Sequence, residues 1–147
     1  MLPTAYNNNY QILQGPGYVA ILVEMIHDMR IISLDGRPHI PANIRQWLGD
    51  SRGRWEGNTL VVDVANFNDQ TWFDRAGNFH SDALHVVERY TRTDAGTITY
   101  EASIEDPKVF TRPWKISMPL VLHREPNFRI LEYECQAYAE DSAKESK

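Results

Sequence analysis

Several histidine, arginine and carboxylate side chains lie close enough along the chain to form acid/base pairs. Glu24 precedes His27 by three residues, and Asp28 offers a turn that would bring the two together. A carboxylate that orients an imidazole is the usual general-base arrangement. The alternative is a charged turn in which Glu24 pairs with Arg30. The segment therefore offers Glu24 and His27 as catalytic candidates and Arg30 as a binding candidate.

A second group lies at the turn signature DGRPH, residues 35–39. Arg37 and His39 beside a turn could hold an anionic or hydroxylated ligand. The alternative is a turn in which Asp35 hydrogen-bonds to its own backbone while Arg37 pairs with a carboxylate. We expect Arg37 and His39 either to bind a ligand or to stabilise the turn.

The third group lies in residues 84–92, which we predict to be a strand. His85 and Arg89 then share one face, while Glu88 shares the other face with the remaining even-numbered residues. One face points inward, so an ionisable group lies inside the fold and needs a partner. Partners of suitable charge on later strands are Glu101, Glu132 and Glu134. This pattern predicts either an acid/base site or a structural ion pair.

A long polar loop is expected at residues 66–82, between two predicted strands. Loops of this length inside a compact domain are usually functional. Trp72 and Phe73 have little reason to be core residues and are expected at the mouth of an apolar or sugar-stacking pocket. His80, near the end of the loop, is a further candidate for ligand binding.

The elements that must position these groups are short, alternating and β-branched. We predict strands at residues 10–14, 18–25, 29–34, 53–56, 59–65, 84–92, 97–104, 114–118 and 128–136. Gly57-Asn58 suits a two-residue hairpin turn, and Trp55 and Trp114 are expected in the core. Helical spacing of apolar residues predicts one short helix within residues 40–48.

This order predicts an all-β fold, an antiparallel meander closing into a lipocalin-like up-and-down barrel, with a β-sandwich as the alternative. The chain of 147 residues suits one domain. We expect a flexible arm at residues 1–9, a barrel domain at 10–138 and a disordered tail at 139–147.

Composition narrows the classes of function. Lys and Arg number 15 against 20 Asp and Glu, a net charge of -5, which disfavours nucleic acid. The longest apolar run, residues 19–26, contains Glu24 and is too short to span a membrane. The single cysteine, Cys135, rules out an internal disulfide. The five histidines lack the spacing typical of metal ligands, so neither a metal nor a cofactor is expected.

Six segments also resemble, in order, the C-terminal half of a large family of uncharacterised bacterial proteins that are typically exported. The segments are NNNYQILQGPGYVAIL, EMIHDMRIISLDGRPHIP, IRQWLGDSRGRWEGNTLVVDVANFND, LHVVERYTR, IEDPKVFTRPW and LEYEC. Asn58 stands where the family usually has Asp, and the ending after Cys135 differs. The resemblance implies an exported or periplasmic protein and no known activity, although the N-terminal residues predict no signal peptide.

Two functions of different class follow. The first is a cofactor-free lyase, isomerase or hydrolase acting on a small organic or sugar-like substrate in the barrel. Its candidate catalytic residues are Glu24, His27, His85, Glu88, Arg89 and Glu132, and its candidate substrate-binding residues are Arg30, Arg37, His39, Trp72, Phe73 and His80. The second is a lipocalin-like carrier or an interaction domain of the cell envelope, with the same charges as ionic struts. A homodimer is a further expectation in either case.

Overall fold

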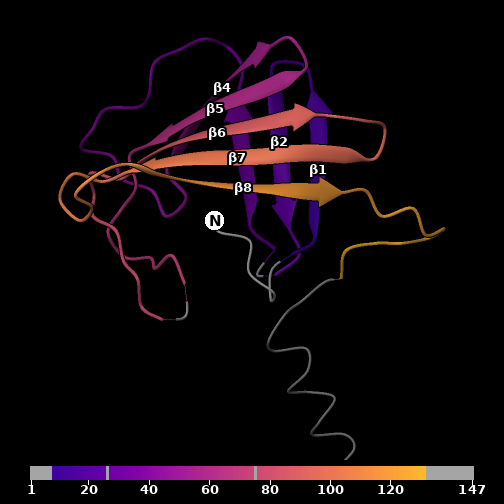
Figure 1. Cartoon of the computed structure of the whole chain (residues 1–147). Coiled ribbons are helices and arrows are strands. Elements are labelled where there is room, and N and C mark those ends of the chain that lie inside the picture. The colour runs from indigo at the N-terminus through magenta and orange to yellow at the C-terminus, as the bar shows by residue number, and fades with distance from the viewer. Residues whose placement is uncertain (1–7, 26, 75, 132–147) are drawn as a thin grey trace, which may run out of the picture.

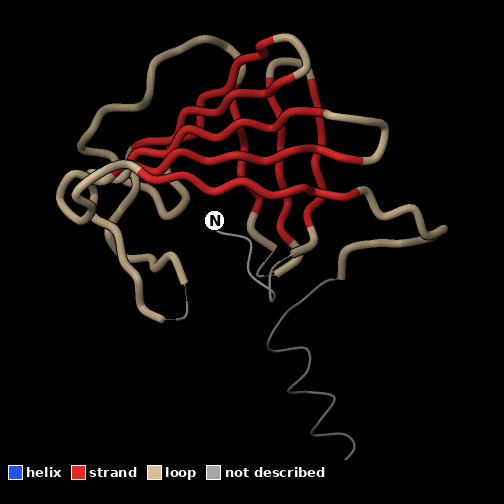
Figure 2. Tube along the Cα trace, viewed as in Figure 1, coloured by secondary structure: helices blue, strands red, loops and turns tan. Residues whose placement is uncertain are grey.

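The computed structural model describes residues 8–25, 27–74 and 76–131. Eight strands lie in this part: β1 (Tyr10–Gly15), β2 (Tyr18–Val23), β3 (Met29–Ser33), β4 (Asp50–Glu56), β5 (Thr59–Ala65), β6 (His85–Arg92), β7 (Thr97–Glu105) and β8 (Trp114–Val121). They form one sheet whose spatial order follows the sequence. The described residues contain no helix (Figure 2), and the prediction of an all-β fold is confirmed.

The sheet curls into a half-barrel. Figure 1 shows β1 and β2 running crosswise behind β5–β8, so that one face of the sheet is concave. Neighbouring strands are antiparallel except β3 and β4, which pair in parallel at Ile32–Ser51 and Ser33–Arg52. The long connection of residues 34–49 makes this parallel step geometrically possible. Within the described residues β1 and β8 each pair with one neighbour, so the predicted meander curls without joining its two edges.

The tight turns agree with the turn residues in the sequence. Glu56 pairs with Thr59, which leaves Gly57 and Asn58 as the predicted two-residue turn between β4 and β5. Gly57 adopts a φ of 61°, a left-handed conformation that glycine reaches at no steric cost. Gly53 serves a different purpose, because a Cβ at this position would stand 2.6 Å from Ile32 Cγ2. A side chain here would push β4 away from the core.

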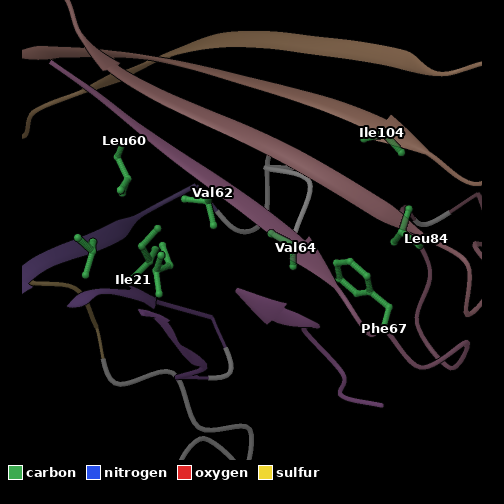
Figure 3. Close-up of a cluster of buried hydrophobic side chains, with 9 residues drawn as sticks. Ile21, Leu60, Val62, Val64, Phe67, Leu84 and Ile104 are labelled. Carbon is green, nitrogen blue, oxygen red and sulfur yellow. The ribbon is translucent and has the colours of Figure 1, made fainter. Parts of the chain in front are cut away.

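The main hydrophobic cluster lies between the crosswise strands. Its buried members come from β2, β3, β5, β7 and the loop beside them: Val19, Ile21, Ile32, Leu60, Val62, Val64, Phe67, Leu84 and Ile104. Figure 3 shows Val62 and Val64 of β5 with Ile21, Phe67 and Leu84 around them. Burial of these side chains is the main force that holds the curled sheet together.

Two long loops meet at one end of the sheet, on the left in Figures 1 and 2. The Asn66 side-chain amide lies within 3.0–3.1 Å of the carbonyl oxygens of Ile40, Pro41 and Ile44, and so joins the loop of residues 34–49 to the end of β5. The buried Asp106 carboxylate accepts hydrogen bonds from the Ser81 amide and hydroxyl at 2.6 and 2.7 Å. Residues 66–84 are thereby fixed to the end of β7.

Some predictions about the fold need correction. Residues 40–48 form turns and bends rather than a helix, because their backbone groups bond to Asn66 and the loop after it. Residues 128–131 are not a strand, and the rest of the predicted strand 128–136 lies outside the described residues, as do most of the predicted arm 1–9 and the whole tail 139–147. Trp55 is 48% exposed and not a core residue, whereas Trp114 packs against the cluster as expected.

Candidate functional site

The concave face of the half-barrel encloses a cavity of about 340 Å³. Its wall is mostly apolar and comes from every strand except β4, from the connection between β2 and β3 and from the two long loops. The apolar residues include Ile12, Ile21, Val23, Trp47, Val64, Phe67, Leu84, Val86, Ala102, Ile104 and Leu120. A largely apolar cavity of this size with a few polar groups is typical of a site for a small molecule.

Four polar side chains of the cavity wall gather around one buried ion pair. Arg30 Nη2 of β3 lies 2.6 Å from Glu88 Oε2 of β6, and the two side chains are 12% and 4% exposed. The same Nη2 donates to the Tyr90 hydroxyl oxygen at 3.1 Å. The hydroxyl of Tyr100 donates to Glu88 Oε1 at 2.8 Å, and that of Tyr90 does so at 3.3 Å. We refer to Arg30, Glu88, Tyr90 and Tyr100 as the polar cluster.

Opposite charges decide the protonation states in the polar cluster. Burial alone would raise the pKa of Glu88, but the charge of Arg30 and hydrogen bonds from Arg30 and Tyr100 lower it. Burial and the nearby Glu88 carboxylate raise the pKa values of Tyr90 and Tyr100. At neutral pH the cluster therefore holds one cation, one anion and two neutral phenols, with a net charge of zero.

Strand alternation and register bring the cluster together. Glu88 and Tyr90 are two residues apart on β6 and point to the concave face. Tyr100 stands directly opposite Tyr90 on β7, with the ring centroids 4.9 Å apart. Arg30 reaches them from β3, which the curl of the sheet carries to the other side of the cavity. Glu88 and Arg30 are thus predicted site residues that the structure places in one cavity.

The loop of residues 66–84 supplies further polar groups of the cavity wall, in addition to Tyr10 of β1 and Asp28 between β2 and β3. His80 is buried, its Nε2 is 2.6 Å from Thr71 Oγ1, and its Nδ1 is 3.0 Å from the Ser81 carbonyl oxygen. Because that carbonyl only accepts, Nδ1 carries a proton and donates it, while Nε2 shares a second hydrogen bond with the Thr71 hydroxyl. Phe73 packs edge-on against His80, whereas Trp72 lines the cavity and is 72% exposed.

His85 and His39 lie on the opposite, convex face, where they share a carboxylate. His39 Nε2 and His85 Nε2 are both 2.9 Å from Asp63 Oδ1, and His39 Nδ1 is 2.8 Å from Asp50 Oδ2. Arg52 also bonds to Asp50, through Nε at 2.8 Å and Nη2 at 3.0 Å. Neither histidine lines the cavity, and this convex cluster joins the segment after β3 to β4, β5 and β6.

The convex cluster predicts a dependence of stability on pH. Burial alone would raise the pKa of Asp63, but hydrogen bonds from His39 and His85 lower it below the usual 3.8. A carboxyl group whose pKa is lower in the folded than in the unfolded state stabilises the fold at pH values above the unfolded-state pKa. This contribution is lost as the pH falls through the folded-state pKa. The wild-type protein should unfold at lower urea concentrations as the pH is lowered from about 5 to 2. We expect this decrease in the midpoint of urea unfolding to be smaller in Asp63→Asn.

The control for this measurement is Asp69→Asn, since Asp69 is exposed and makes no side-chain hydrogen bond to the described residues. This variant should keep the wild-type decline in the urea midpoint. An Asp63→Asn protein that also keeps it would show that the histidine contacts do not stabilise the fold.

The other predicted site residues in the described part of the chain lie away from the cavity. Arg89 on the convex face pairs with Glu56 at 3.0 Å. Arg37 bonds to Asp35 in the turn, which is the structural alternative for that motif. Glu24 accepts from Asn9 at 2.7 Å and the Leu131 amide at 2.8 Å; it bonds to neither His27 nor Arg30.

The predicted catalytic group is therefore divided between two faces of the sheet. Only Glu88 of its described members lines the cavity, while His85 and Arg89 are on the convex face and Glu132 lies outside the described residues. Tyr90 and Tyr100 were not among the predicted site residues. The alternation of β6 could have identified Tyr90 from Glu88, but Tyr100 requires the register between β6 and β7.

Comparisons with models of protein families, with curated proteins and with solved structures find no significant match. The resemblance to an exported bacterial family thus stays a prediction. In the described part of the chain no group of His, Cys, Asp and Glu side chains is arranged to hold a metal ion. The same residues include no helix that is long and apolar enough to cross a membrane.

Proposed function

We propose that the protein binds a small, largely apolar molecule in the concave cavity of the half-barrel. The observation that carries this proposal is the cavity of about 340 Å³, whose mostly apolar wall surrounds the polar cluster. The separation of the candidate groups also favours binding over catalysis. On the convex face His85 bonds to Asp63 and Arg89 pairs with Glu56, so both side chains connect neighbouring strands.

A test of binding can use N-phenyl-1-naphthylamine, a neutral probe whose fluorescence rises in apolar surroundings. We expect a saturable rise with the wild-type protein and a loss of affinity of about 3- to 10-fold for Trp72→Ala, which removes an aromatic contact at the cavity. Trp55→Ala is the matched control, since Trp55 is also exposed but does not line the cavity. No saturable rise, or equal effects of the two variants, would contradict the proposal.

A cofactor-free acid/base enzyme is the second candidate, and one observation favours it. The Glu88 carboxylate and the hydroxyls of Tyr90 and Tyr100 lie within hydrogen-bond distance of one another in the cavity. Such groups could transfer a proton to a bound substrate. Any ligand that displaces the probe should therefore be recovered and analysed by mass spectrometry, since conversion to product that stops in Glu88→Gln would favour this candidate.

A further inference from the structure

Arg30 offers donors to the cavity that no described protein group uses. Among the described residues only its Nη2 takes part in hydrogen bonds, to Glu88 at 2.6 Å and to Tyr90 at 3.1 Å. A guanidinium has five N–H groups in a planar fork, so the N–H groups of Nε and Nη1 have no acceptor among the described residues. Arg30 lines the cavity. These N–H groups are therefore available to an acceptor atom on a ligand.

The charge of the guanidinium, by contrast, is already matched. Glu88 is 4% exposed on its side chain and is ionised because of Arg30. A ligand carboxylate beside Arg30 would place a second negative charge near Glu88 in a poorly screened environment, which is costly. A cationic group on the ligand would be repelled by the positive charge of Arg30 in the same poorly screened environment. An uncharged acceptor avoids both penalties and satisfies the unused donors.

We propose that the ligand is an uncharged molecule with an apolar body and an oxygen acceptor at one end, of the ketone, amide or alcohol class, which Arg30 binds through Nε and Nη1. This inference rests on the proposed function, because it concerns the same cavity. The polar cluster then selects against fatty acids and other carboxylates. Glu88 acts as the residue that sets this specificity, because its carboxylate balances the charge of Arg30.

The test compares three ligands of nearly equal shape in displacement of N-phenyl-1-naphthylamine at neutral pH. They are 2-acetylnaphthalene, 2-isopropenylnaphthalene and 2-naphthoate. In the wild-type protein the ketone should bind about 10-fold more tightly than the hydrocarbon, the gain expected for a hydrogen bond to a charged donor. The carboxylate should bind most weakly of the three.

Two variants identify the residues responsible. Arg30→Met should remove the preference for the ketone over the hydrocarbon. Glu88→Gln keeps an acceptor for the tyrosine hydroxyls but leaves the Arg30 charge unmatched, so 2-naphthoate should become the preferred ligand. The ranking in the wild-type protein decides the inference even if a variant does not fold.

The outcomes separate the two proposals. Equal binding of ketone and hydrocarbon, or preference of the wild-type protein for the carboxylate, would overturn the inference and leave the proposed function standing. Failure of the probe and all three ligands to bind would overturn both.

Discussion

Glu88→Ala is expected to lower the free energy of unfolding by about 3–5 kcal/mol, because it leaves the Arg30 guanidinium buried without its counter-ion. The side chains of the pair are 4% and 12% exposed, so water screens the remaining charge poorly. The substitution also removes the acceptor of the Tyr100 hydroxyl. Urea denaturation monitored by tryptophan fluorescence measures the change.

Two further variants show whether the unpaired charge causes this loss. Glu101→Ala is the matched control, since Glu101 is an exposed glutamate on the neighbouring strand β7, and it should change the stability little. Arg30→Met combined with Glu88→Gln removes both charges and keeps an acceptor for the phenols. The double variant should be more stable than Glu88→Ala. If it is less stable, hydrogen bonds and packing rather than the unpaired charge account for the loss.

Ile32→Ala should lower the free energy of unfolding by about 2–5 kcal/mol, the usual range for truncating a fully buried isoleucine. Ile32 is 0% exposed and packs against β4 at Gly53, where no side chain is present to fill the space that the substitution leaves. The resulting void would lie between β3 and β4, the pair where the sheet changes from antiparallel to parallel. The same urea titration measures this loss.

The matched control is Ile31→Ala. Ile31 precedes Ile32 on β3 and points to the other face, where it is 52% exposed. Because this side chain is already half exposed, its truncation removes little buried apolar surface. The free energy of unfolding should therefore stay close to that of the wild type. Equal losses for Ile31→Ala and Ile32→Ala would mean that the packing between β3 and β4 contributes little to stability.

Local sequence patterns identified most of the strands. The hairpin at Gly57-Asn58 depends on residues that tolerate a left-handed turn, and the strand at residues 84–92 depends on a period of two. Both are properties of a few consecutive residues, so they can be recognised without knowledge of the fold. The same pattern correctly separated Glu88 from His85 and Arg89.

Local patterns failed where distant residues compete for the same groups. The apolar spacing in residues 40–48 suggested a helix, but the side chain of Asn66 takes up three carbonyl oxygens of that region. Arg30 was expected to pair with Glu24 six residues away if it formed a structural turn. It pairs instead with Glu88, a residue 58 positions further along the chain.

The sequence by itself determined the class of the fold, the sites of the tight turns and which residues of a strand share a face. Only the tertiary structure decided which face is concave, and with it which ionisable groups enter the cavity. The reason is that alternation has the same form on both faces of a strand. The curl of the sheet brings β3 across from β6 and β7, and this long-range geometry places Arg30 beside Glu88 and the two tyrosines.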